Sequence, residues 1–144
     1  MDICKYKELY HDEIVSIIEC QKVCKLGTTN NASVTIVPMY YVYACEDNSP
    51  VFYLISMEYG DKMEDMEETG LACIYIDRTR RAGRCSFTES VVANGFASFV
   101  DNPTEKEYIM KRFIDKYHRP ITCCDDVCLV FIKITVSKIS GRCY

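Results

Sequence analysis

The sequence has little of what several common functional classes require. Only two histidines, His11 and His118, occur among the 144 residues. A Ser-His-Asp triad and a zinc site built on several histidines are therefore poorly supported. No apolar run approaches the roughly 18 residues of a membrane-spanning helix, so we expect no membrane partner. The first residues, Met1 to Lys5, lack the basic and then apolar order of a signal peptide, which predicts a cytoplasmic protein.

Positive charge is also scarce. The chain carries 17 basic residues against 21 acidic ones, which gives a net charge of −4. Nucleic-acid binding needs a concentrated positive face, so we expect no nucleic-acid partner. A local basic segment, predicted as a loop at residues 78–84, carries Arg78, Arg80, Arg81 and Arg84. It is either a solvated loop or a contact for the phosphates of a nicotinamide donor or for another anionic substrate.

Ten cysteines are many for a chain without an export signal. In a reducing compartment they are expected as free thiols rather than as disulfides. None of their spacings is the CxxC pair that structural zinc commonly uses. Cys20 and Cys24 are spaced to share one face of a predicted helix. Small buried apolar side chains are the expected role of the cysteines, and a thiol-based redox sensor is the alternative.

Hydrophobic periodicity predicts a mainly β chain that folds as one domain over residues 1–144. Helical spacing at residues 7–24 predicts an amphipathic helix at the start. β-Branched and aromatic runs joined by short turns favour a β-barrel with peripheral helices over a parallel sheet. The predicted strands are 26–29, 34–43, 51–56, 71–77, 86–100 with a bulge at Gly95, and 127–136. A short helix is predicted at 60–68.

A longer helix is predicted to begin at Pro103, with Asp101 or Asn102 as its N-cap. Helical spacing assigns its buried face to five residues: Ile109, Met110, Phe113, Ile114 and Tyr117.

The strand at 34–43 contains Pro38, which cannot donate a ladder hydrogen bond. Pro38 must therefore lie at an edge, at a bulge or at a break in the pairing. A break of that kind leaves neighbouring backbone groups free for a ligand. Tyr40 and Tyr41 follow in the same strand. Core packing is the default expectation for both rings, and stacking on a flat ligand is the alternative.

The strand at 51–56 ends at Ser56, and Lys62 follows at the start of the short helix. A helix N-terminus exposes unpaired N–H groups and carries a partial positive charge. A hydroxyl and an ammonium beside it make the place suitable for a phosphate monoester. Taken alone, however, this pattern more often marks a solvated surface lysine.

Several stretches in a fixed order extend the pattern over residues 13–142. Together they resemble the FMN-binding split barrel of the pyridoxamine 5'-phosphate oxidase-like family, especially its nitroimidazole-reductase-like branch. The matching stretches are Gly27-Thr28-Thr29, Val37-Pro38-Met39-Tyr40-Tyr41, Tyr53-Leu54-Ile55-Ser56 with Gly60 and Lys62, Ser90-Val91 with Gly95, the helix start at 101–106, and the ending from Ile134 to Arg142.

The resemblance implies a homodimer with an FMN site at each side of its interface. It implies four parts for that site in this chain. The strand whose backbone lies along the isoalloxazine ring matches Val37, Pro38, Met39 and Tyr40. The strand end that contacts the ring and the phosphate matches Ile55, Ser56 and the following Met57. The phosphate cation matches Lys62, and a position that reaches the flavin from the second subunit matches Ser90 and Val91.

The same resemblance implies an FMN-dependent oxidoreductase that passes electrons from NAD(P)H through FMN to a small-molecule acceptor. This chain departs from the branch at Ile55, where a histidine usually lies near the flavin. The absence of this histidine argues against nitroimidazole reduction and does not affect the assignment of FMN as the cofactor. The alternative is a non-catalytic stress protein on the same fold that holds flavin, haem or a deazaflavin, with His11 or His118 as the haem ligand.

Overall fold

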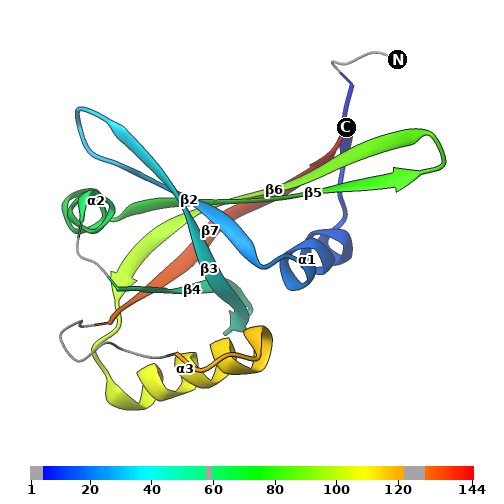
Figure 1. Ribbon diagram of the computed structural model, residues 1–144. Coiled ribbons are helices and arrows are strands. Elements are labelled where there is room, and N and C mark those ends of the chain that lie inside the picture. Colours follow the sequence, from blue (N-terminus) through cyan, green and yellow to red (C-terminus); the bar gives the residue numbers. More distant parts are fainter. Residues whose placement is uncertain (1–4, 58–59, 122–128) are drawn as a thin grey trace.

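The computed structural model describes residues 5–57, 60–121 and 129–144, and its strands form one antiparallel sheet that curls on itself (Figure 1). Three helices lie around this sheet in the described part of the chain: α1 (His11–Cys20), α2 (Asp61–Thr69) and α3 (Pro103–Tyr117). The strands are β1 (Lys7–Glu8), β2 (Val23–Thr29), β3 (Val34–Glu46), β4 (Ser49–Ser56), β5 (Leu71–Ala82), β6 (Cys85–Phe99) and β7 (Val130–Cys143).

The last strand closes the sheet into a barrel. The strand order is β1-β7-β4-β3-β2-β5-β6, and β7 also pairs with β6. The first part of β7 pairs with β4 on one side, and residues 132–143 pair with β6 on the other. β1 adds two residues to the end of β7. The predicted β-barrel with peripheral helices is therefore confirmed, and the fold is a split barrel.

Side-chain alternation places the main core inside the barrel. Leu26 on β2 and Ile74 on β5 are fully buried, and their neighbours in sequence point outward. α1 and α2 contribute Ile17 and Met63 to the same core cluster. Full burial of one such side chain contributes about 1.5–3 kcal/mol. None of the described helices is long and apolar enough to cross a membrane.

α3 covers the outside of the barrel. Its buried side chains form a second core cluster with outward-facing residues of three strands, and the contacts include Val42, Tyr53, Ile109, Phe113 and Phe131. Asn102, one of the two predicted caps, accepts hydrogen bonds from two backbone N–H groups of the first turn. Ile114 was predicted to be buried and is 42% exposed, so that prediction is wrong. The apolar stripe of α3 is wider than the strip of barrel that it covers.

The first helix is shorter than the predicted span of 7–24. Lys7 and Glu8 form β1, α1 ends at Cys20, and β2 begins at Val23. Cys24 lies inside the barrel on β2, so the predicted helix face shared by Cys20 and Cys24 is wrong. The helical spacing of α1 runs into the alternation of β2 without a break. The spacing of apolar residues alone therefore predicted a helix that is too long at its C-terminal end.

The arginine-rich segment predicted as a loop at 78–84 is mostly strand, which corrects that prediction. β5 continues to Ala82 and pairs with β6 as far as Cys85. Only a tight turn remains at Gly83, whose φ of 63° favours glycine. Pairing with β6 decides this segment, because strand propensity depends strongly on context.

β7 extends past the predicted end at 136 and runs to Cys143, while the predicted start at 127–128 lies outside the described residues. The predicted bulge at Gly95 is confirmed, because the β6–β7 register shifts between Asn94 and Gly95. A Cβ at position 95 would overlap the backbone carbonyl of Thr135, so the close approach of these strands requires glycine here.

Candidate functional site

The sequence-predicted site residues of β3 and β4 lie where these two strands part. The ladder between the strands runs from Glu46 and Ser49 to Tyr41 and Leu54, and stops there. Beyond this point β3 pairs only with β2, while β4 pairs only with β7. The residues predicted from the resemblance, 37–40 on β3 and 55–57 on and after β4, therefore lie on either side of the parting.

Pro38 occupies the singly paired part of β3, opposite Lys25 of β2. Its predicted position at an edge is thus confirmed. No described strand pairs with the other edge of β3 between Val34 and Tyr40. Backbone donors and acceptors along this edge are available to a bound group, because nothing in the described sheet occupies their side.

The side chains of β3 alternate between the core and the outer face. Val37 and Met39 pack against the barrel core, whereas Pro38 and Tyr40 are exposed. Tyr41 is fully buried, and its hydroxyl lies 2.6 Å from the carbonyl oxygen of Ile18 in α1 and 3.0 Å from that of Gln21 just after it. Core packing is therefore the role of Tyr41. Tyr40 is 59% exposed, and its ring packs against that of Tyr117 with the ring centres 5.1 Å apart.

The strand end of β4 leads directly to α2. Ile55 packs against the cluster under α3, Ser56 is buried, and Met57 is 48% exposed. Lys62 is partly buried in the first turn of α2, and the N-cap residue Gly60 offers no side chain to the helix. The structure thus places Lys62 at a helix N-terminus that follows β4, as the sequence predicts.

Ser90 and Val91 lie apart from these residues within one chain. They are on β6, which is separated from β3 by β2 and β5 in the strand order. Val91 is fully buried in the barrel, and its backbone is paired with Ile76 of β5 on one side and with Gly141 of β7 on the other. Ser90 is on the outward face next to Tyr75, whose pKa is raised mainly by burial while Ser90 opposes that rise.

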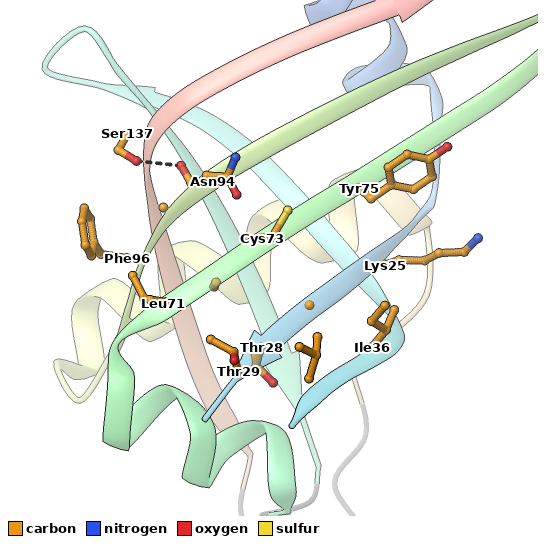
Figure 2. Close-up of a pocket in the computed structure, with 14 residues that line it drawn as sticks. Lys25, Thr28, Thr29, Ile36, Leu71, Cys73, Tyr75, Asn94, Phe96 and Ser137 are labelled. Atoms are coloured by element: carbon orange, nitrogen blue, oxygen red, sulfur yellow. Dashed lines mark hydrogen bonds between the residues drawn. The ribbon is translucent and has the colours of Figure 1, made fainter. Parts of the chain in front are cut away.

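Sequence reasoning missed a large concavity in the described part of the molecule. It is a groove of about 800 Å³ on the outer face of β2, β3, β5 and β6 (Figure 2). None of the ten sequence-predicted site residues lines it. Its lining is Lys25, Gly27, Thr28, Thr29, Val34, Ile36, Leu71, Ala72, Cys73, Tyr75, Asn94, Gly95, Phe96 and Ser137.

The groove is apolar at one end and carries an ammonium and a phenol hydroxyl at the other. Figure 2 shows Phe96 and Leu71 at one end and Lys25 beside Tyr75 at the other. The Lys25 Nζ lies 5.7 Å from the centre of the Tyr75 ring. Burial raises the pKa of Cys73 and is the main cause of the raised pKa of Tyr75. Both groups therefore stay protonated at neutral pH.

Hydrogen bonds beneath the groove hold its floor in place. The Thr28 hydroxyl donates to the buried carboxylate of Asp65 on α2 at 3.1 Å, and Asn30 Nδ2 donates to the same carboxylate at 2.9 Å. At the far side, the Ser137 hydroxyl donates to the backbone carbonyl of Asn94 at 3.1 Å (Figure 2). The lining strands are thus tied both to α2 and to β7.

A second pocket joins the groove to the sequence-predicted strand. This pocket has a volume of about 510 Å³ and shares Lys25 and Tyr75 with the groove. Pro38 is part of its lining, and Cys20, Gln21, Lys22, Val23 and Asp77 complete it. The outer face is therefore one concave surface that runs from Phe96 to Pro38.

A sequence signal for this surface exists in β3. Its residues 34–40 are apolar on both faces, with Val34 and Ile36 outward and Val37 and Met39 inward. A strand that is apolar on both faces is typically covered on both. With the barrel core on one side, the outward residues indicate a second covered face.

The outer face suits a flat ligand with hydrogen-bonding edges. Its apolar walls match a planar ring, and the open edge of β3 supplies backbone groups. The described residues include no cluster of three or more His, Cys, Asp or Glu that could hold a metal ion. His11 and His118 are both exposed, and neither lines the groove or the second pocket.

Comparison with solved structures finds this fold in proteins of low sequence identity. A candidate 5-nitroimidazole antibiotic resistance protein from Bacteroides thetaiotaomicron is 21% identical with a TM-score of 0.79, covering 96% of this chain and 87% of that one. An FAD-binding protein from Mesorhizobium loti is 20% identical with a TM-score of 0.71, covering 96% and 98%. An FAD-binding protein from Mycobacterium smegmatis is 12% identical with a TM-score of 0.66, covering 96% and 98%. No curated protein matches the chain by sequence.

A sequence profile gives the family directly. The profile described as pyridoxamine 5'-phosphate oxidase matches residues 10–143. That range contains the three described helices and every strand of the barrel from β2 to β7. The resemblance found in the motifs is thereby confirmed over nearly the whole sequence. The chain belongs to the pyridoxamine 5'-phosphate oxidase family.

Proposed function

We propose that this chain is a flavoprotein that binds FMN on the outer face of its barrel. The observation that carries the proposal is the continuity of that face. The apolar groove, Pro38 and the open edge of β3 follow one another along it. The FAD-binding proteins with the same fold support a flavin as the ligand class.

The residues of β3 fit the ring of such a cofactor. A flavin ring needs a flat apolar surface and backbone groups for its polar edge. The exposed Pro38 and Tyr40 offer the surface, and the open edge from 37 to 40 offers the donors and acceptors. Ile55 lies at the end of the neighbouring strand β4, beside the parting, and its side chain packs against the cluster under α3.

The phosphate of FMN would be held at the start of α2. Ser56 ends β4, and Lys62 lies in the first turn of the helix. An ammonium and free helix N–H groups together neutralise a phosphate by charge and by hydrogen bonds. The first turn also carries the acidic Asp61 and Glu64. Lys62 is therefore the described cation of this turn that would offset their repulsion.

A homodimer would complete the site. Val34, Ile36, Leu71 and Phe96 are between 45% and 69% exposed, which is a large apolar surface for a lone chain. A second copy that covers the groove would bury it. Ser90, on the outward face of β6, would then contribute from the partner subunit, whereas Val91 is enclosed in its own barrel between β5 and β7. Cytoplasmic location remains part of the proposal.

When bound, FMN supplies the redox chemistry, taking electrons from NAD(P)H and giving them to a small-molecule acceptor. The chain's own residues bind and orient the reactants and keep water from the ring. The groove lining contains no carboxylate and no histidine. The protonated Cys73 and Tyr75 are poor bases at neutral pH. Asp77 is a carboxylate of the second pocket, but the groove itself offers no base, so positioning is the task proposed for the groove residues.

An anaerobic absorbance experiment tests the proposal. The purified protein, loaded with FMN if needed, is mixed with NADH or NADPH, and bleaching of the flavin bands is followed. Bleaching and recovery on adding a nitroaromatic or quinone acceptor support an oxidoreductase. Bound flavin that neither donor bleaches would favour the non-catalytic flavin-binding alternative. A Soret band after haem addition, lost on replacing His11 or His118, would favour the haem-binding one.

A further inference from the structure

The β5–β6 hairpin forms a basic arm, defined here as residues 78–89. Figure 1 shows the hairpin extending well past the body of the barrel. Arg78 and Arg80 both pair with Glu89, at 3.0 and 3.3 Å. No described carboxylate lies within ion-pair distance of Arg81 or Arg84. The arm thus presents unpaired positive charge in a chain whose net charge is −4.

α2 forms an acidic helix at the opposite end of β5. Its exposed residues are Asp61, Glu64, Glu67 and Glu68, and in the described structure none of them takes part in an ion pair. Glu67 and Glu68 lie in the last turn, which has no basic residue. The C-terminal end of a helix favours cations, so these two carboxylates are unfavourable in the isolated chain. A positively charged group on a partner would offset this unfavourable interaction.

β5 connects the acidic helix, the groove and the basic arm on one side of the molecule. Leu71, Cys73 and Tyr75 line the groove, and Arg81 belongs to the same alternating set of side chains. Tyr75 lies in both the groove and the second pocket, which makes it the centre of the concave face. At ~3.3 Å per residue, Arg81 is ~20 Å from Tyr75 in one direction, and the end of α2 is ~15 Å away in the other.

When two copies stack this face on itself about a two-fold axis in the plane of the interface, the axis has two limiting directions relative to β5. An axis along β5 places the two basic arms together, which like charges oppose. An axis across β5 near Tyr75 places each arm over the acidic helix of the other copy, at matching distances. Opposite charges favour the second arrangement and disfavour the first.

We infer that this chain dimerises with the basic arm of each protomer, through Arg81 and Arg84, on the acidic helix of the other, through Glu67 and Glu68. The inference rests on the homodimer of the proposed function. It adds what orients the dimer and which residues make its outer contacts. The apolar groove supplies the buried centre of the interface, and the two charged contacts lie at its rim.

A charge-swap experiment on the full chain tests this arrangement. Sedimentation equilibrium gives the dimer dissociation constant at low salt. Arg81→Glu with Arg84→Glu should weaken the dimer about tenfold or more, as should Glu67→Lys with Glu68→Lys. Adding lysines to the last turn of α2 suits the helix dipole, so weakening in that variant does not come from an unstable helix.

Mixing the two reversed proteins should restore a dimer, because each arm then meets a helix of opposite charge. The chain with all four substitutions should also dimerise. Lys111→Glu with Arg119→Glu, on and just after α3, is the control and should leave the dimer unchanged. A monomeric parent overturns the inference, as does a reversed variant that dimerises normally or is not restored by mixing. Flavin content measured in parallel reports separately on the proposed function.

Discussion

Replacement of Lys62 by alanine tests the phosphate part of the proposed FMN site. Lys62 is partly buried in the first turn of α2, beside the acidic Asp61 and Glu64. A hydrogen bond to a charged group contributes about 1.5–3 kcal/mol, and the partial exposure of Lys62 places it at the lower end. A loss of about 1.5–2 kcal/mol corresponds to a roughly 10- to 30-fold weaker Kd. The remaining carboxylates would then repel the phosphate.

The assay compares two flavins that differ only in the phosphate. The apoprotein is titrated with FMN and with riboflavin while flavin fluorescence is followed. Lys62→Ala should weaken FMN binding and leave riboflavin binding unchanged, and the FMN loss should shrink as salt is added. Lys111→Ala, at an exposed position of α3, serves as the matched control. An equal loss for both flavins, or no loss for FMN, would refute the reasoning.

Three further predictions concern the barrel itself. Gly95→Ala should lower the free energy of unfolding by about 1–3 kcal/mol in urea, because its Cβ would overlap a backbone carbonyl of β7; a stability equal to the parent would contradict this. Burial is the main cause that lowers the pKa of Lys116 from 10.5 to about 8. Between about pH 8 and pH 10.5, Lys116 therefore holds its proton in the unfolded chain but has lost it in the folded one. Its contribution to the free energy of unfolding rises with pH across that range. The parent should therefore gain stability relative to Lys116→Met over this range, and a constant difference would count against it. Burial raises the pKa of Cys24 to about 12, so iodoacetamide at about pH 8 should label the exposed Cys20 and spare Cys24 in a peptide map.

The barrel was predictable because its local signals have direct physical causes. Pro38 marks the part of β3 that has lost one neighbour, and Gly95 marks the bulge at the β6–β7 seam. Asn102 marks a helix start. Each of these depends on backbone chemistry that the residue type itself determines. Such signals can be interpreted without knowing how the rest of the chain folds.

Element ends that depend on distant pairing were not predictable in the same way. The helix end at Cys20 is followed by β2 only because that segment pairs with both β3 and β5. The arginines after Asp77 are strand because β6 lies beside them. Local propensity does not contain this information, since the partner strand lies many residues away.

The candidate site also has a part that local sequence predicts and a part that only the folded sheet reveals. Ser56 and Lys62 are close in sequence, so the spacing alone places a hydroxyl before a helix N-terminus. The groove joins Thr28, Cys73 and Phe96 from three strands, and only the closed sheet brings them together. Its apolar character was nonetheless present in β3, whose two faces are both apolar.

FMN binding on the outer face of this barrel is the property on which the proposed function depends. The most direct measurement is an absorbance spectrum of the purified protein before and after addition of FMN, followed by removal of free flavin on a desalting column. We expect flavin bands that stay with the protein at one FMN per chain. A protein that carries no flavin absorbance and retains none after the column would contradict it.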